Sequence, residues 1–563
     1  MQPVRTLHIL TPLAKQAAAP VASVRVGDSE DLIADLRRFP PLVYKKSEDG
    51  IYVDVTTHFT SPRDHWTAAR EWLAEFTRQT NLQDALAIEG YGFWWTLNAQ
   101  KFVAGLTEPG NAFAWIDLLE AIHQHVRVER TLIYGQHGII CHLASQILKE
   151  AEIVIRPGLD SARTREGRSS QLGLIVARFF LGLAYLVYSL FRHPDICLFS
   201  NTNLLRQTAT RSKEQLCDVY MGDVARALAA RDWRVAVAEK YGPNASWSGL
   251  VARGFFFPSD IIFLLSTPIL GRTGLYRQVR RKWREEWSNF QPSLGAHMNF
   301  RGYDLSPLLL PLIRDEFLVH APDLEVMIRL WRHILDLWRP QVLYLNNSYG
   351  RAAFTAIVAA KLLGIPTVEQ QHGVIGKNHI AYLMPEDLGR RTTPPLCDAM
   401  AVWGEHTRRF FTNRNIQRPE QMEICGFPRI DAMLENRPSR SLSRKQLGIP
   451  PDAHAVLYTS NGFAQDLIPE LLDSIRRTPI SNDTHWLIKL HPRENTRPLW
   501  EAAVNERNLL TVKVLEGSYD FYALLAACDI HASFASTTLI EAAILGKLNL
   551  GLDLAQVPDP AGY

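Results

Sequence analysis

Residues 529–545 read DIHASFASTTLIEAAIL, and this stretch decides the fold. The run 529–532 predicts a short strand, a serine-rich turn follows it, and the spacing over 538–545 predicts a helix. A strand, a turn and a helix in this order form one βα unit of a parallel sheet. Residues 485–493, HWLIKLHPR, hold another strand, which ends where His491 precedes a proline.

The same alternation of strands and helices extends back through the chain. A strand over 131–134 and a helix over 139–149 predict an early βα unit. From about residue 300 onward the pattern becomes regular, and it favours two α/β domains with parallel sheets. The strands expected there are 342–345, 366–369, 399–403, 422–425 and 455–458, with helices over 322–338 and 351–363.

Composition narrows the class of protein. The chain has 563 residues, 47% of them hydrophobic and 21% charged, which is typical of a globular protein with several domains. A net charge of +3 argues against a general nucleic-acid binder. None of the six cysteines forms a CxxC pair, so we expect neither a disulfide framework nor a structural zinc. The N-terminus lacks a long apolar segment, so we expect no secretory signal and a cytoplasmic location.

Residues 155–300 differ from the rest and are expected to form a helical insertion in the N-terminal half. Residues 172–191 are almost entirely apolar, with arginines before and after them. Three interpretations stay open: a buried segment, a segment that docks on an anionic membrane surface, and a membrane span. The basic, aromatic run 271–287, GRTGLYRQVRRKWREEW, supports the second.

Polar residues stand at the ends of the expected strands, which is where open α/β sheets bind ligands. His491 ends one of these strands, and Lys489 and Arg493 flank it. This group suits a diphosphate, because the imidazole can stabilise the charge that develops on a leaving phosphate.

The turn after residue 532 predicts the other half of a donor site. Ser533, Ser536, Thr537 and Thr538 stand at the start of a helix, where hydroxyls and free backbone N–H groups bind anions. Glu541 either closes a capping box with Thr538 or faces ribose hydroxyls. Asn461 ends another strand of this half and completes the expected donor set.

His372 is the candidate base in the other half. It ends a strand in the turn Gln370-Gln371-His372-Gly373, where a neutral imidazole could take a proton from an attacking hydroxyl. Glu369 could orient it or act as base itself. Asn346, Asn347 and His137 also follow strands and are candidate acceptor-binding residues.

The region 300–550 resembles GT-B-fold transferases of bacterial surface polysaccharides: capsule Kdo transferases, polysialyltransferases and teichoic-acid CDP-glycerol glycerophosphotransferases. The resemblance implies that His491, Ser536 and Thr537 hold the phosphates of a cytidine-type donor and that His372 is the base. The segments that carry it are GIPTVEQQHG, AVWGEHTRRFF, EICGFPRIDAM, LIKLHPRE and DIHASFASTTLIEAAILGK.

We therefore expect an α/β protein of GT-B architecture, with two Rossmann-like domains. The expected acceptor-side domain covers 1–425, a linker covers 426–439, and the donor domain covers 440–563. The expected reaction moves a sugar from a CMP- or UDP-activated donor to a glycan or lipid-linked acceptor in capsule polysaccharide biosynthesis. No cofactor is expected, and no metal either, because no carboxylate cluster stands at a strand end. The expected partners are this donor, this acceptor and, peripherally, the inner membrane.

Three other functions stay open. A CDP-glycerol-type phosphotransferase would use the same histidines and differ in its donor. A UDP-sugar 2-epimerase would need no acceptor and would place acidic residues around the sugar. A non-catalytic GT-B scaffold would bind no nucleotide.

Overall fold

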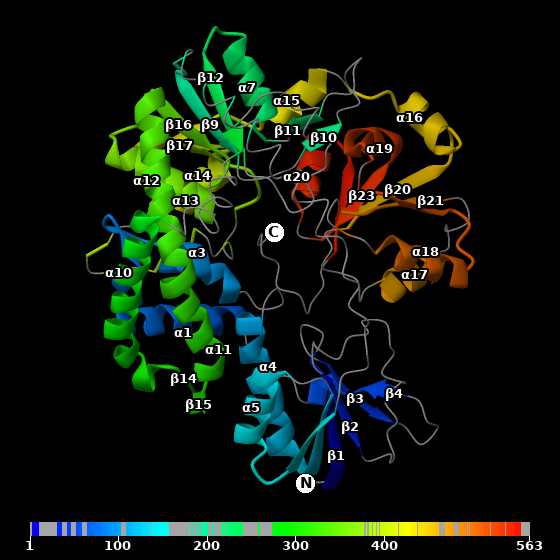
Figure 1. Ribbon diagram of the computed structural model, residues 1–563. Coiled ribbons are helices and arrows are strands. Elements are labelled where there is room, and N and C mark those ends of the chain that lie inside the picture. Colours follow the sequence, from blue (N-terminus) through cyan, green and yellow to red (C-terminus); the bar gives the residue numbers. More distant parts are fainter. Residues whose placement is uncertain are drawn as a thin grey trace.

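Three sheets built mainly from parallel strands organise the chain in this computed structural model (Figure 1). A six-stranded sheet near the N-terminus lies at the bottom of the view, a seven-stranded sheet at the upper left and a five-stranded sheet at the upper right. The structure describes residues 3–10, 31–36, 42–46, 52–58, 65–102, 108–134, 137–156, 180, 184, 187, 191, 193–200, 205–207, 216–218, 220–239 and 257–258, and then 273–552 except 376–378, 380–381, 386, 390, 393–394, 415, 436, 461–467, 478–483, 492–493, 495, 518 and 535.

The six-stranded sheet as a whole was not expected from the sequence, although the βα unit expected over 131–134 and 139–149 lies in it as β7 and α5. Its order is β4-β3-β2-β1-β7-β8, and the pairs around β1 and β7 are parallel while those around β3 are antiparallel. The strands are β1 (Pro3–Leu10), β2 (Leu32–Asp35), β3 (Leu42–Lys46), β4 (Tyr52–Asp54), β7 (Arg127–Tyr134) and β8 (Glu152–Arg156). The helices of this region are α1 (His65–Thr80), α2 (Leu82–Ala85), α3 (Trp94–Asn98), α4 (Glu108–His125) and α5 (Gly138–Ile147).

The seven-stranded sheet is entirely parallel and has the order β13-β12-β9-β16-β17-β18-β19. The chain order reverses between β9 and β16, which is the switch point of a Rossmann-like sheet. The strands are β9 (Ile196–Ser200), β12 (Val235–Glu239), β13 (Phe257–Pro258), β16 (Val342–Leu345), β17 (Thr367–Gln370), β18 (Ala399–Val402) and β19 (Met422–Ile424). The helices are α7 (Gly222–Ala229), α10 (Gly274–Phe290), α11 (Ser306–Asp315), α12 (Ala321–Trp338), α13 (Arg351–Leu362) and α14 (Glu405–Thr412).

The five-stranded sheet is also parallel, with the order β22-β21-β20-β23-β24 and a switch point between β20 and β23. Its strands are β20 (His454–Thr459), β21 (Thr484–Lys489), β22 (Val512–Leu515), β23 (Ile530–Ser533) and β24 (Leu548–Gly551). The helices are α15 (Pro428–Glu435), α16 (Arg440–Leu447), α17 (Ile468–Arg477), α18 (Arg497–Glu506), α19 (Phe521–Ala527) and α20 (Thr537–Ile544). The two Rossmann-like sheets confirm the expected GT-B-type architecture, and the six-stranded sheet adds to it.

The described strands outside these sheets form three antiparallel pairs. They are β5 (Ala87–Ile88) with β6 (Tyr91–Gly92), β10 (Leu205–Gln207) with β11 (Leu216–Asp218), and β14 (Asn299–Phe300) with β15 (Tyr303–Asp304).

The apolar clusters of the two halves are separate from each other. One continuous apolar cluster runs from Leu7 in β1 through Trp94 and Trp283 to Phe354 in α13, so the first two sheets share a core. In the last sheet, alternate residues of β20 enter opposite clusters, with Leu457 on one face and Tyr458 on the other. This alternation follows from the period of two along a strand and leaves the sheet covered on both faces.

The expectation of a helical insertion over 155–300 is met only in part by its described residues, which include the helices α7 and α10 but also strands. The described part of this range contributes β9, β12 and β13 to the seven-stranded sheet, with β9 at its centre. The five residues of β9, ICLFS, are all buried, and a short apolar run of this kind does not distinguish a strand from a buried helical turn.

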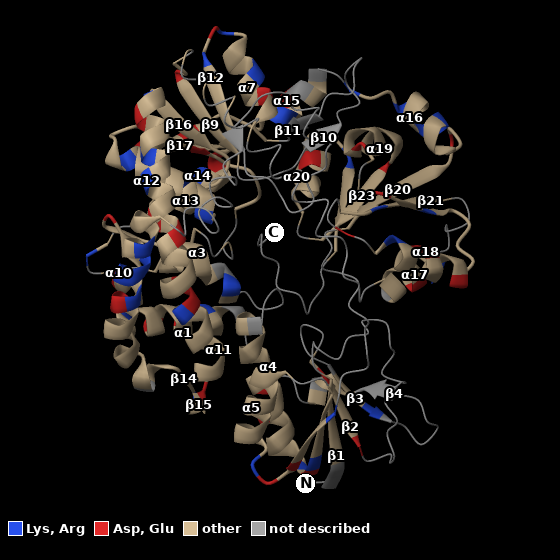
Figure 2. Ribbon diagram, viewed as in Figure 1, with Lys and Arg blue, Asp and Glu red and all other residues tan. Residues whose placement is uncertain are grey.

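The aromatic residues of α10 face the interior rather than a membrane. Tyr276, Trp283 and Trp287 are buried, and the Trp283 indole donates a hydrogen bond of 2.9 Å to Glu325 in α12. The basic residues of α10 lie on its outer face, where Figure 2 shows them in blue. The membrane interpretation therefore loses the support of this helix's aromatic residues.

Four positions of the apolar stretch 172–191 are described, namely Phe180, Ala184, Val187 and Phe191. All four are helical and exposed, and their spacing of four, three and four places them on one helix face. This face is not buried, which contradicts the first of the three interpretations for these residues. Across the described part of the chain, no helix has both the length and the apolar character needed to span a membrane.

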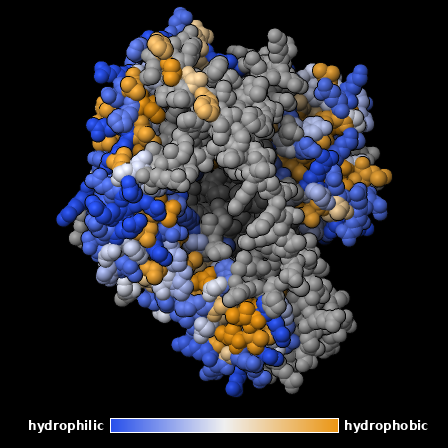
Figure 3. Space-filling model, in the orientation of Figure 1, coloured by the Kyte–Doolittle hydropathy of each residue, from blue (hydrophilic) through white to orange (hydrophobic). Residues whose placement is uncertain are grey.

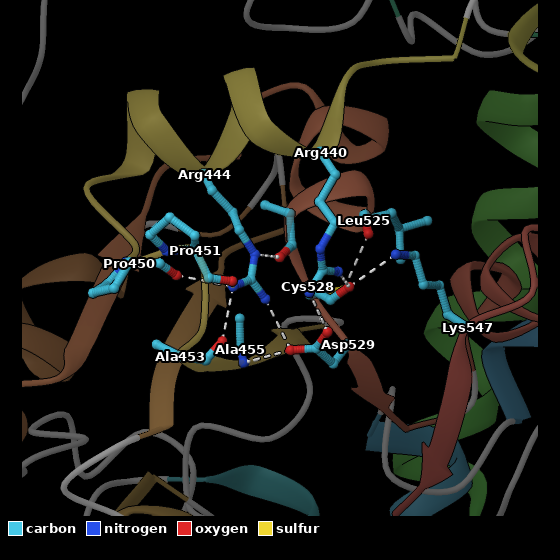
Figure 4. Close-up of polar contacts among 11 residues, drawn as sticks. Arg440, Arg444, Pro450, Pro451, Ala453, Ala455, Leu525, Cys528, Asp529 and Lys547 are labelled. Atoms are coloured by element: carbon cyan, nitrogen blue, oxygen red, sulfur yellow. Dashed lines mark hydrogen bonds and ion pairs between the residues drawn. The ribbon is translucent and has the colours of Figure 1, made fainter.

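A buried arginine ties α16 to the five-stranded sheet (Figure 4). The Arg444 guanidinium donates to Asp529 at 2.9 Å, to the carbonyl of Ala527 at 3.0 Å and to three carbonyls in the turn before β20. Asp529 also accepts the backbone N–H of Ala455 at 2.9 Å and a hydrogen bond from Arg440. This network holds the starts of β20 and β23 in register.

The segment between the two halves is packed rather than free. The ring of Phe427 stacks on Trp403, which follows β18, with centroids 4.1 Å apart. Ile430 and Met433 of α15 belong to the same apolar cluster as the five-stranded sheet. The expected linker 426–439 therefore contains a helix that packs with the second half, while the domain limits of 1–425 and 440–563 stay predictions.

Candidate active site

His372 lies just beyond the end of β17 and beside an aromatic partner. Its Nε2 is 2.6 Å from the hydroxyl of Tyr349, which belongs to the segment between β16 and α13. The ring of Tyr220, from the segment before α7, meets His372 edge-on with centroids 6.0 Å apart. The expected base therefore sits between two tyrosines at the carboxyl end of the seven-stranded sheet.

Glu369 does not contact His372 through any of its described hydrogen bonds. Its carboxylate accepts the hydroxyl of Tyr382 and the backbone N–H of Ser348 at 3.1 Å. Burial raises the pKa of Glu369, against the lowering effect of these two donors. Glu369 is only 3% exposed, so its geometry fits a residue that holds the loop after β16 rather than a base open to substrate.

His372 and its neighbour His379 are both held neutral by their surroundings. Burial, with a contribution from His379, lowers the pKa of His372 to about 3. Burial also lowers the pKa of His379 to about 4, and the rings of His379 and Tyr349 pack with centroids 5.5 Å apart. A neutral imidazole is the form that can accept a proton, and the same lowering of the pKa makes each ring a weaker base than a free histidine.

This burial predicts a loss of stability in acid. The unfolded histidines titrate near 6.5, so the unfolded state binds more protons between that pH and the folded pKa values of about 3 and about 4. Stability is therefore complete above about pH 6.5 and falls as the pH drops below it, by up to about 1.4 kcal/mol per pH unit for each histidine. The melting temperature should fall less between about pH 7 and about pH 5 in His372→Gln and His379→Gln than in the wild type. Equal falls in all three proteins would contradict the assignment.

The expected acceptor residues divide between two sheets. Asn346 and Asn347 follow β16, next to the switch point, and both are buried. His137 instead follows β7 of the six-stranded sheet, is 3% exposed and packs edge-on against Trp115 at 5.5 Å. Their roles toward an acceptor stay predictions, and the sheet order separates His137 from the strand ends that carry the other two.

The start of α20 lies directly over the switch point of the five-stranded sheet. The Thr538 hydroxyl is 2.9 Å from the hydroxyl of Thr459, the last residue of β20. Ser536 is the N-cap and accepts the backbone N–H of Thr538 at 3.3 Å, so the capping box expected from Thr538 is wrong. Thr537 is partly exposed as the first residue of the helix. Ser533 is fully buried and donates to the Thr459 carbonyl at 2.8 Å, which makes it a tie between strands.

The carboxylate of Glu494 holds the loop after β21 in place. Glu494 accepts the backbone N–H of His491 at 3.2 Å and the hydroxyl of Ser460 at 2.6 Å, which joins the ends of β20 and β21. Lys489 is 5% exposed and its amino group donates to the Gly517 carbonyl at 2.9 Å, which differs from the expected phosphate contact. Asn461 and Arg493 lie outside the described residues.

Glu541 is engaged inside the protein rather than open to a ribose. It is 4% exposed and accepts the hydroxyl of Tyr522 at 2.6 Å. The guanidinium of Arg429, from α15, lies over the Tyr522 ring at 4.9 Å. Arg429 was missed in the sequence, although it stands in the quoted segment EICGFPRIDAM directly after the Gly-Phe-Pro turn. The tyrosines at 220, 349 and 382 were missed too, because loop residues carry no periodic signal.

Figure 3 shows a hollow at the centre of this face. The two strand-end sites just described belong to different sheets, and in Figure 1 α20 lies on the side of the five-stranded sheet that is nearer the seven-stranded sheet. In the described part of the chain, no group of three or more His, Cys, Asp or Glu side chains is arranged to hold a metal ion.

Comparisons with known proteins give distant structural neighbours only. No protein-family model matches the chain. No curated protein matches it in sequence. Among solved structures, UDP-GlcNAc 2-epimerase from Neisseria meningitidis, bound to UDP-GlcNAc, is 15% identical with a TM-score of 0.35, and the match covers 63% of this chain and 81% of that one.

Two further neighbours are comparably remote. MurG of Acinetobacter baumannii is 9% identical with a TM-score of 0.32, over 65% of this chain and 81% of that one. HepE of Anabaena, in complex with UDP, is 15% identical with a TM-score of 0.31, over 63% of this chain and 80% of that one. At these values the neighbours carry no conclusion about activity, which depends on the site itself.

Proposed function

We propose that this protein is a glycosyltransferase that moves a sugar from a nucleotide-sugar donor to a hydroxyl of a glycan or lipid-linked acceptor. The expected setting is bacterial surface polysaccharide biosynthesis. The exposed apolar face that carries Phe180 and Phe191 supports peripheral contact with the inner membrane, where lipid-linked acceptors reside.

One observation carries the proposal: the N-terminus of α20 and the neutral His372 lie at the carboxyl ends of strands in the two Rossmann-like sheets. The first turn of α20 offers backbone N–H groups and the Thr537 hydroxyl at the switch point between β20 and β23. Helix N-termini at such switch points bind the phosphates of nucleotides. His372 stands at the corresponding edge of the other sheet, where an acceptor would enter.

The chemistry that this arrangement supports is a single displacement. The acceptor oxygen forms a bond to the anomeric carbon, the bond from that carbon to the donor phosphate breaks, and the acceptor proton passes to the pair of His372 and Tyr349. Burial keeps His372 neutral before the reaction, and the 2.6 Å contact with Tyr349 fixes the orientation of the ring. The start of α20 stabilises the negative charge that develops on the leaving phosphate.

Two carboxylates near these strand ends, Glu369 and Glu541, favour a transferase over a 2-epimerase. Glu369 and Glu541 are both buried, and each accepts a tyrosine hydroxyl. An epimerase would want acidic groups open to the sugar. A CDP-glycerol-type transferase would use the same geometry as the glycosyltransferase, and only the identity of the donor distinguishes the two.

A nucleotide screen tests the proposal. Thermal-shift titration with CMP, CDP, UDP and GDP should stabilise the wild type with at least one of them, because ligands that bind only the folded state raise its stability. His491→Ala should weaken the shift, and His454→Ala, the same change at the amino end of the neighbouring strand β20, should not. Binding of none of the four would rule out the transferase. A preference for CMP would indicate a sialic-acid-like or Kdo-like donor, CDP a glycerol-like donor, and UDP a hexose.

A further inference from the structure

Arg429 stands between the two halves of the molecule and belongs to the segment that joins them. It is the second residue of α15, and the apolar side chains of this helix pack into the core of the five-stranded half. Glu541 and Tyr522 from that half raise the pKa of its guanidinium. Tyr220, whose ring meets His372 in the other half, also raises this pKa. Arg429 therefore lies in the segment that joins the two halves, with its guanidinium beside the Tyr522 ring, whose hydroxyl donates to Glu541 of α20.

The guanidinium of Arg429 is charged and short of partners. Burial opposes its charge, yet Glu541, Tyr522, Tyr220 and Asp520 together raise its pKa above the ordinary value. Among the described residues it has a single close contact, the face of the Tyr522 ring at 4.9 Å, and no hydrogen bond or ion pair. A guanidinium carries five N–H donors, and none of the five is used by a hydrogen bond within the described part of the chain.

The fold shows why this arginine differs from its neighbours. Arg440 and Arg444 use their donors on Asp529 and on carbonyl groups within the five-stranded half. Glu541, the carboxylate with the largest effect on Arg429, already accepts the Tyr522 hydroxyl and forms no ion pair with the guanidinium. The ring of Tyr522 orients the planar guanidinium without using its N–H groups, as cation–π contacts do.

We propose that Arg429 is a donor-binding residue that clamps the diphosphate, or the single phosphate, of the nucleotide donor against the first turn of α20. This inference rests on the proposed function and adds to it a residue from the interdomain segment. An arginine fork binds two phosphate oxygens at once, whereas the helix N-terminus supplies backbone donors to the others.

Calorimetric titration with UDP, inorganic pyrophosphate and uridine tests this assignment on the full chain. Arg429→Gln should weaken UDP and pyrophosphate binding by about 10- to 100-fold, the range expected for losing hydrogen bonds to a charged group. Uridine, which lacks phosphate, should bind Arg429→Gln as it binds the wild type. Arg429→Lys should retain part of the affinity, because it keeps the charge and loses the fork. Arg437→Gln, an exposed position just after α15, is the matched control and should change nothing.

The outcomes separate this inference from the proposed function. If the wild type binds UDP and Arg429→Gln binds it equally, the clamp is wrong and the proposed function stands. If Arg429→Gln and Arg429→Lys lose uridine as strongly as UDP, Arg429 acts on the fold and the clamp is again wrong. A wild type that binds neither UDP nor pyrophosphate overturns the clamp for these ligands, and the nucleotide screen then decides the proposed function separately.

Discussion

His372→Ala should lower the rate of sugar transfer by about 100- to 10,000-fold, the range measured when a general base is lost. The reason is that the acceptor hydroxyl would lose the group that takes its proton. The nucleotide should bind as before, because the phosphates lie at α20 in the other half. Steady-state release of nucleotide from the donor that the screen identifies, together with calorimetry of the same variant, measures both quantities.

Two further variants make this test specific. Tyr349→Phe removes the hydroxyl that lies 2.6 Å from His372 and should give a smaller loss of rate, because the imidazole itself remains. His454→Ala changes an exposed histidine at the far end of β20 and should keep the wild-type rate. If His372→Ala retained the full rate while the protein bound donor normally, His372 would not be the base.

Arg444→Ala should destabilise the five-stranded half by about 3–5 kcal/mol, the cost typical of removing one partner of a buried ion pair. The substitution removes all donors to Asp529 Oδ2 except the Ala455 N–H, and it leaves the carbonyls of Ala527 and of the turn before β20 without their shared partner. Urea unfolding, with amide hydrogen exchange in β20 and β23 as the local readout, measures the change.

Arg440→Ala is the matched control for this experiment. Arg440 contacts the same carboxylate, but its side chain is 47% exposed, compared with 3% for Arg444. Exposed pairs contribute about 0–1 kcal/mol, so the two variants should differ several-fold in their effect. Equal effects would show that the hydrogen bonds from Arg444 to the backbone carbonyls (Figure 4) do not account for the stability of this half.

Much of the fold could be predicted because strands that are buried in parallel sheets have distinct sequence patterns. The expected strand 342–345 is β16 without any change of limits, and the expected helices 322–338 and 351–363 are α12 and α13 to within one residue. The six-stranded sheet was missed, although LHIL at 7–10 is the buried end of β1. Its pairing depends on partners more than a hundred residues away, such as β7, which a local pattern does not reveal.

The candidate site was predictable as a set of positions but not as a set of contacts. His372, His491 and the start of α20 do stand at strand ends, because polar residues after a buried strand must lie at its edge. The direction of each side chain depends on tertiary partners. Lys489 was expected at a phosphate and instead donates to a carbonyl beyond β22, while Tyr349 and Arg429 come from loops and an interdomain helix.

The central claim is that the start of α20 binds the phosphates of a nucleotide donor. The most direct measurement is a crystal structure of the full chain with the nucleotide that gives the largest thermal shift. The account predicts that phosphate oxygens lie within hydrogen-bond distance of the Thr537 backbone N–H and hydroxyl and of the Arg429 guanidinium. Phosphate density elsewhere, such as beside His137 at the six-stranded sheet, with the start of α20 free of ligand, would contradict it.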